Sequence, residues 1–266
     1  MAVVLTRSGP RVRPLPYPRP VLLLLPPSET KAVGGVGAPL DHSALTCPEL
    51  TPVREKIAHA LVELAADVPG SLAALALSER QADEVRRNAE LWRSPTMPAL
   101  ARYTGVLYDA LDLPTLKKGE RDRAFHRLAI ASALFGVVRG GDPIPAYRLS
   151  GGSALPSIGP LGALWRPALE PALAEIDDFV VDLRSGPYAT LARIPHAVTV
   201  RVVSEDGSGV RKAVSHFNKA HKGLLARALV VSRAEPKNLN GLVKVAKAAG
   251  FRVEKTGDRT ADLFTG

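Results

Sequence analysis

Two short, largely apolar segments constrain the fold of this 266-residue chain more than any other feature. VLLLL at residues 21–25 is stopped by two prolines, and FVVDL at 179–183 is stopped by the turn sequence RSGPY. Apolar runs this short, when turn residues bound them, are typical of β-strands that are buried on both faces. A membrane-spanning helix needs about 20 apolar residues, so we expect no contact with a membrane.

Helix signals lie between and after these strands. Thr51 followed by Pro52 predicts the start of a helix that ends near residue 66. Ser78 and Gln81 predict a capping box at the start of the next helix. Further helices are predicted over residues 105–111, 120–135, 217–231 and 238–249.

Other segments have strand character. Polar and apolar residues alternate at 197–203, and the Asp-Gly pair at 206–207 is a strong turn signal, so a hairpin with 210–217 is predicted. Residues 99–103 are predicted as a further strand. Strands and helices alternate without a linker between two halves. We therefore predict fold class α+β: a single mixed α/β domain over residues 21–266, with a central, partly antiparallel sheet and surrounding helices.

The N-terminal residues 1–20 are rich in proline and arginine, and we expect them to form a disordered extension. Arginines before an apolar run are also found in secretory signals. Here the apolar run is too short, and no cleavage site of small residues follows it. The segment therefore does not match a secretory signal.

The residues that usually bind metals are sparse. Cys47 is the single cysteine, which excludes an intrachain disulfide framework and a cysteine-rich zinc site. His216 and His221 are five residues apart, so on a helix they would point in different directions. We predict no metal site and no cofactor.

The charge of the chain points to an anionic partner. Lysine and arginine number 35 against 26 aspartates and glutamates, a formal net charge of +9. The excess is concentrated in residues 201–255, and we expect these cations to converge on one exposed stripe as wide as a double helix. The candidate DNA contacts are the cations of the predicted hairpin and basic helix: Lys212, Lys219, Lys222 and Arg227. Charge alone favours a soluble surface over a nucleic-acid contact, because most runs of charge only face solvent.

Polar side chains also follow the two apolar strands, and in α/β folds ligands collect at the carboxyl ends of strands. Two further arginines, in the segment VVRGGDPIPAYRL, could bind phosphate or carboxylate. The predicted anion-binding residues are Ser28, Thr30, Lys31, Arg139, Arg148 and Arg184. The alternative for Arg139 and Arg148 is that they attach loops to the sheet.

Five segments, in order along the chain, carry more specific information. They are LLLLPPSETK, YTGVLYDAL, ALFGVVRGGDPIPAYRLSGG, VVDLRSGPYATL and SHFNKAHKGLLARALV. Together they resemble the YaaA peroxide stress protein family over roughly residues 21–233. Gly140, Ser150 and Pro187 depart from the family's pattern.

The resemblance implies a function and a partner. It implies a cytoplasmic protein of peroxide defence that binds double-stranded DNA largely without sequence specificity and helps limit unincorporated iron. It also implies a helix-hairpin-helix-like element. We place that element where the predicted helix 120–135 turns through Gly136, Gly140 and Gly141, because backbone amides at glycine turns can bind phosphates.

The first hypothesis is therefore a duplex DNA binder. The alternative is an enzyme that acts on a nucleotide or another anionic small molecule. In that case Lys31, Arg139 and Arg148 would hold the anion, and Ser185 or Tyr188 would handle a proton. No general base is evident in the motifs, so we lean against catalysis. Action through a protein partner is a third possibility.

Overall fold

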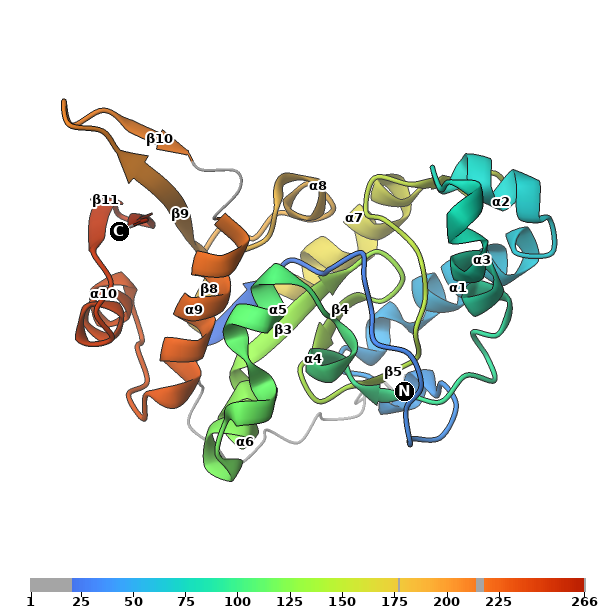
Figure 1. Cartoon of the computed structure of the whole chain (residues 1–266), viewed down its shortest axis with the longest axis horizontal. Coiled ribbons are helices and arrows are strands. Elements are labelled where there is room, and N and C mark those ends of the chain that lie inside the picture. Colours follow the sequence, from blue (N-terminus) through green and yellow to red (C-terminus); the bar gives the residue numbers. More distant parts are fainter. Residues whose placement is uncertain (1–20, 177, 214–217, 266) are drawn as a thin grey trace, which may run out of the picture.

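The first apolar run forms the strand β1 (Leu22–Leu25), which is buried at every residue. It pairs in parallel with β3 (Leu128–Ser132) on one side and β8 (Val180–Asp182) on the other. Leucines on both faces of β1 require that both faces of the sheet be covered. In the computed structural model, which describes residues 21–176, 178–213 and 218–265, helices provide that cover (Figure 1).

The main sheet has the strand order β11-β12-β9-β8-β1-β3-β4, and β10 pairs with the end of β9. The remaining strands of this sheet are β4 (Gly136–Arg139), β9 (Val198–Glu205), β10 (Arg211–Ala213), β11 (Val253–Gly257) and β12 (Thr260–Phe264). Parallel pairing runs from β12 through β9, β8 and β1 to β3, whereas β4, β10 and β11 are antiparallel to their neighbours. The predicted mixed α/β class with a partly antiparallel sheet is confirmed.

The helices and two small sheets surround this main sheet. The longer helices are α1 (Thr51–Leu64), α3 (Ala82–Ala89), α6 (Lys118–Arg127), α7 (Leu161–Ala174), α9 (Asn218–Val231) and α10 (Leu239–Ala248). The shorter helices are α2 (Val68–Ala74), α4 (Ala99–Arg102), α5 (Val106–Leu111) and α8 (Gly186–Ala189). β2 (Met97–Pro98) pairs with β5 (Pro143–Ile144), and β6 (Ala154–Leu155) pairs with β7 (Gly159–Pro160).

Arginines join α5, α6 and α9, which lie side by side over the sheet (Figure 1). Arg123 and Arg127 of α6 donate to carbonyl oxygens at the end of α9, including Val230 O at 2.7 Å and Leu229 O at 2.6 Å. Because the last carbonyls of a helix have no partner within it, these guanidinium groups complete their hydrogen bonding.

Several predicted elements are confirmed. β9 and β10 form the predicted hairpin, although residues 214–217 of its second strand lie outside the described residues. α9 and α10 match the two predicted C-terminal helices within one or two residues, and α1 matches the helix predicted from Thr51. At the predicted capping box, the Ser78 amide donates to Gln81 Oε1 at 3.1 Å.

The helix predicted over 120–135 is wrong beyond Arg127. Its second half forms β3, which continues through a turn into β4. A fully buried strand is apolar at every position, so it also satisfies helical spacing. Gly136, the first residue of β4, has φ of +72°, and a Cβ there would lie 2.7 Å from Trp165 Cζ3. Residues 120–141 therefore form a helix and a β-hairpin, and the predicted helix-hairpin-helix placement is wrong.

The strand predicted at 99–103 is also wrong, because these residues form the single-turn helix α4. The turn positions the buried side chain of Arg102, which donates to four carbonyl oxygens. These acceptors are Ala32 O at 2.5 Å, Gly34 O at 2.9 Å, Pro95 O at 3.0 Å and Ile144 O at 3.2 Å. Arg102 thus helps to fix the glycine-rich loop after Lys31, together with two isolated antiparallel bridges, Lys31 with Tyr103 and Gly37 with Thr96.

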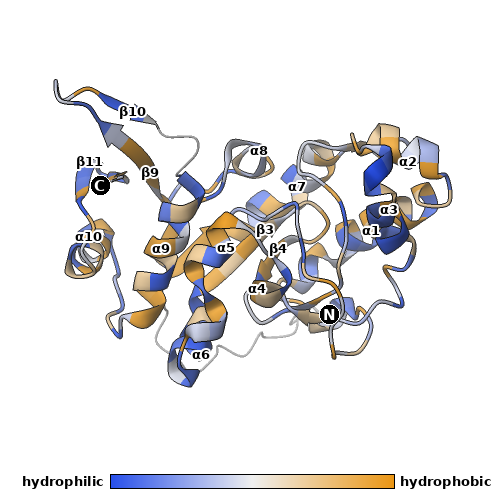
Figure 2. Ribbon diagram, in the orientation of Figure 1, coloured by the Kyte–Doolittle hydropathy of each residue, from blue (hydrophilic) through white to orange (hydrophobic). Residues whose placement is uncertain are grey.

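Hydropathy follows this arrangement. The strands at the centre of the sheet are apolar, and α3 and α6 are mostly hydrophilic (Figure 2). Among the residues that the structure describes, no helix is both long and apolar enough to cross a membrane.

Candidate functional site

A cavity of about 280 Å³ lies where β1 ends. We call it the strand-end pocket. Three parts of the chain line it: the loop 26–30 after β1, the segment 104–108 at the start of α5, and Lys219 on the first turn of α9. Two of the predicted anion-binding residues, Ser28 and Thr30, therefore share a pocket with Lys219, a predicted DNA contact.

Three hydroxyl groups gather in this pocket. Ser28 Oγ and Thr104 Oγ1 each lie 3.1 Å from Thr30 Oγ1. Gly105, with φ of +97°, passes close to them, and a Cβ there would lie 3.3 Å from Ser28 Oγ. Hydroxyls can donate or accept hydrogen bonds, so the cluster can reorient toward an anion. The sequence analysis missed Thr104, because only the fold brings it beside Thr30.

Lys31 lies behind the pocket and is almost fully buried. Its ammonium donates to Ser28 O at 3.0 Å and to Glu29 O at 3.4 Å, so it supports the loop that carries Ser28 and Thr30. The Nζ also lies 4.2 Å from the centre of the Tyr147 ring, a favourable cation–π contact. Burial lowers the pKa of Lys31 to about 7, although the nearby Glu29 carboxylate opposes this shift.

A buried chain of hydroxyls continues from Lys31 into the core. Tyr103 Oη lies 2.8 Å from Tyr147 Oη, which lies 2.8 Å from Ser132 Oγ on β3. Burial raises the pKa of Tyr103 to about 12 and also raises that of Tyr147, so both phenols are neutral. The sequence analysis did not single out Ser132, because only the fold brings it beside Tyr147.

The two arginines of the third motif have different positions. Arg148 lies at the pocket, where it pairs with the Glu29 carboxylate at 3.2 Å. Arg139 instead donates to His126 O at 2.8 Å and pairs with Asp178 at 3.6 Å. Arg139 therefore attaches a loop, which was the alternative stated for it, and the structure does not bring Arg139 to the pocket.

The side chains that follow β8 form hydrogen bonds within the protein. Arg184 donates to both carboxylate oxygens of Asp182, at 3.0 and 2.8 Å, and to Tyr188 O at 3.1 Å. Ser185 lies at the start of α8. Tyr188 is buried and its hydroxyl accepts from the Gly151 amide at 3.1 Å. Burial raises the pKa of Tyr188, so it is poorly suited to exchange a proton near neutral pH.

Two of the four predicted DNA contacts are engaged within the protein. Lys222 is buried, donates to Arg184 O at 3.4 Å, and has its pKa lowered by burial. Arg227 donates to Leu111 O and Asp112 O, both at 2.8 Å, where α5 ends. Lys212 and Lys219 are exposed and form no ion pair with any residue that the structure describes.

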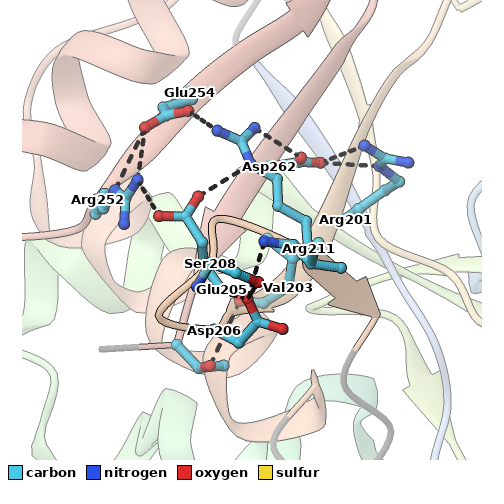
Figure 3. A network of polar contacts seen from close by, with 11 residues as sticks. Arg201, Val203, Glu205, Asp206, Ser208, Arg211, Arg252, Glu254 and Asp262 are labelled. Atoms are coloured by element: carbon cyan, nitrogen blue, oxygen red, sulfur yellow. Dashed lines mark hydrogen bonds and ion pairs between the residues drawn. The ribbon is translucent and has the colours of Figure 1, made fainter.

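Carboxylates neutralise three other arginines of the basic region, in a network that joins β9, β10, β11 and β12 (Figure 3). We call it the C-terminal clasp, and it consists of Arg201, Glu205, Arg211, Arg252, Glu254 and Asp262. Arg201 pairs with the buried Asp262 at 2.7 Å, and Arg252 pairs with Glu205 at 2.9 Å. Arg211 and Arg252 also lie over the Phe264 ring. The expectation that the cations of 201–255 form one exposed stripe is therefore wrong.

The single cysteine is not a reactive thiol. Cys47 is half-buried, and burial raises its pKa to about 11. Because the thiolate is the form that attacks peroxide, this environment suppresses the reaction.

The fold and pocket define a mixed α/β protein with cations and hydroxyls at one strand end. A family model described as "Peroxide stress protein YaaA" matches residues 21–256. A UPF0246 protein of Corynebacterium efficiens is 50% identical over 247 residues, covering 91% of this chain and 98% of that protein. A UPF0246 protein of Streptomyces coelicolor is 43% identical over 242 residues, covering 88% and 92%. The chain belongs to the YaaA peroxide stress protein family, as the sequence motifs indicated.

Proposed function

We propose that this chain protects DNA during peroxide stress by binding the phosphate backbone of double-stranded DNA, largely without sequence specificity. The observation that carries the proposal is the position of Lys219, an exposed cation beside the hydroxyls of Ser28 and Thr30. Cations and hydroxyls are the groups that contact phosphates in nonspecific complexes. Lys212, on the neighbouring hairpin, adds a second available cation.

The proposal extends to iron. Ferrous iron held at DNA phosphates produces radicals beside the bases, so a protein that occupies those phosphates also limits the damage that unincorporated iron causes. The support for this part is membership of the peroxide stress family.

Salt dependence tests the DNA proposal. The affinity for a duplex of arbitrary sequence, followed by fluorescence anisotropy from about 50 to 300 mM salt, should fall with a slope of about −0.9 per neutralised phosphate. The variant Lys212→Ala/Lys219→Ala should bind about tenfold more weakly at low salt and should flatten the slope by about two phosphates. Absence of binding at low salt, or an unchanged affinity in the variant, would overturn the proposal.

One observation favours a second function, chemistry on a nucleotide or another anionic small molecule. With its pKa near 7, Lys31 is a group behind the strand-end pocket that can gain or lose a proton at neutral pH. Arg148 would help to hold the anion. A ligand that binds the folded chain raises its melting temperature. A panel of nucleotides and sugar phosphates that gives no stabilisation would contradict this second function.

A further inference from the structure

We propose that the strand-end pocket binds a phosphate monoester, the kind of group present at the phosphorylated end of a DNA strand and on a mononucleotide. This inference rests on the proposed DNA function and specifies which phosphate the pocket takes. A phosphate within a DNA strand is a diester that carries one charge and continues into sugar on both sides. A monoester carries about −1.5 to −2 at neutral pH and has three free oxygens.

The pocket has a closed floor and an open mouth. Pro26, Leu107 and Tyr108 line it and are buried, and Tyr108 Oη donates to Pro26 O at 2.9 Å, which joins the two walls. Thr30 and Lys219 line it and are exposed, so they mark the mouth. The pocket is closed on the side of these buried residues and open to solvent on the other. A terminal phosphate can therefore reach the base of the pocket with all three free oxygens, whereas a phosphodiester would also have to fit the sugars on both sides.

The polar groups match the three free oxygens of a monoester. Three hydroxyls are available: Thr30 Oγ1 lies at the centre, and Ser28 Oγ and Thr104 Oγ1 each lie 3.1 Å from it. They now bond mainly to each other, and Thr30 reaches the Thr104 carbonyl only at 3.4 Å, so an anion can replace these contacts with shorter ones.

The charge of the pocket also suits a dianion. Lys219 contributes one positive charge at the mouth. Glu29 lines the same pocket and opposes an anion, but Arg148 pairs with its carboxylate at 3.2 Å and offsets that charge. A water molecule in the liquid takes about 30 Å³. The cavity of about 280 Å³ is several times larger than that and exceeds the volume of one small ion. It has room for a phosphate with part of its sugar.

The test compares ends with and without phosphate on the full chain. Duplexes of about 20 base pairs with 5′-phosphate or 5′-hydroxyl ends are titrated by anisotropy, beside a closed circular duplex that has no ends. A nucleoside 5′-monophosphate and its nucleoside are titrated by calorimetry. Phosphorylated ends should bind about tenfold more tightly than hydroxyl ends, because charge-assisted hydrogen bonds are involved. The monophosphate should bind, and the nucleoside should not.

Ser28→Ala/Thr30→Val removes two hydroxyls while keeping similar side-chain volumes, and it should erase the preference for phosphorylated ends. The control Thr256→Val removes an exposed hydroxyl on β11 and should keep that preference. Equal affinity for both kinds of end, with no binding of the monophosphate, overturns the inference, and binding of the circular duplex would then leave the DNA function standing. Binding of the monophosphate alone supports the pocket, and failure of every duplex would then overturn the DNA function.

Discussion

The strand-end pocket and the C-terminal clasp both contain positively charged side chains, but these charges have opposite surroundings. In the clasp, Arg211 is surrounded by Glu205, Glu254 and Asp262, so its charge stays within the protein. In the strand-end pocket, Lys219 forms no ion pair with a described residue, and hydroxyls lie beside it. Local charge balance in the folded chain, rather than the number of cations in the sequence, therefore decides where an anion can bind.

A related difference concerns cations that are withdrawn from solvent. Arg227 completes the hydrogen bonding at the end of α5, as Arg123 and Arg127 do for α9. Lys31, which is almost fully buried behind the strand-end pocket, has a pKa that burial lowers to about 7. This region is therefore more sensitive to pH than the clasp, where carboxylates raise the pKa of Arg211 and Arg252.

The largest expected effect is on stability and isolates Lys31. In the folded chain Lys31 loses its proton near pH 7, whereas in the unfolded chain it keeps the proton to about pH 10.4. Between these values the unfolded state binds more protons, so the native state gains stability as pH rises. Relative to Lys31→Met, the free energy of unfolding of the wild type should increase by about 2 kcal/mol from about pH 7.5 to about pH 9.

Urea unfolding of both proteins at several pH values measures this difference. The comparison of slopes remains valid if Lys31→Met is less stable at every pH. Parallel curves for the two proteins would show that Lys31 keeps its charge in the folded chain, and the contrast in pH sensitivity between the two regions would then be lost.

The second prediction compares two variants that each remove two positive charges, one from the clasp and one from the proposed DNA-binding surface. Arg201→Ala/Arg252→Ala removes two positive charges from the clasp, as many as Lys212→Ala/Lys219→Ala removes from the proposed DNA-binding surface. Because carboxylates already pair with the clasp arginines, their loss should change duplex affinity by less than about twofold, against about tenfold for the lysine pair. Anisotropy at low salt gives both values. Equal losses in the two variants would mean that total charge controls binding.

The smallest expected effect concerns Cys47, which lies in neither region. With a pKa of about 11, only about one thiol in ten thousand is ionised at neutral pH. Cys47→Ala should therefore leave duplex affinity unchanged. Mass spectrometry of the folded wild type after exposure to millimolar hydrogen peroxide should find the thiol unmodified. A sulfenic acid at Cys47 would instead indicate that the protein senses peroxide directly.

Much of the fold was predictable because its signals are local. The proline-bounded run of β1, the Asp-Gly turn between β9 and β10, and the capping residues near Ser78 each act within a few residues. The errors at 99–103 and 120–135 occurred where several periodicities fit one apolar segment. The parallel pairing of β12 with β9 depends on contacts between distant segments, and no local sequence pattern indicates this pairing.

The candidate site was predictable in part. Ser28 and Thr30 follow a buried strand, a position that led us to predict them as anion-binding residues, and both line the strand-end pocket. The sequence could not separate Lys219 from Lys222, which are less than one helical turn apart but face solvent and core respectively. Nor could it show that Arg211 and Arg252, far apart in sequence, share the carboxylates of Glu205 and Glu254.

Arg102 has a consequence for how this protein can evolve. Its guanidinium holds the loop after Lys31 through main-chain oxygens alone. Every amino acid supplies such an oxygen, so positions of the loop other than its glycines can be substituted while its path is preserved. Val33 and Val36, which are largely exposed there, are free to be exchanged during divergence, whereas a Cβ at Gly35 would lie 2.5 Å from Thr96 O. Replacement of Arg102 would remove its side-chain bonds to Ala32 O and Gly34 O at once, so tolerance to change in the loop depends in part on selection at one distant codon.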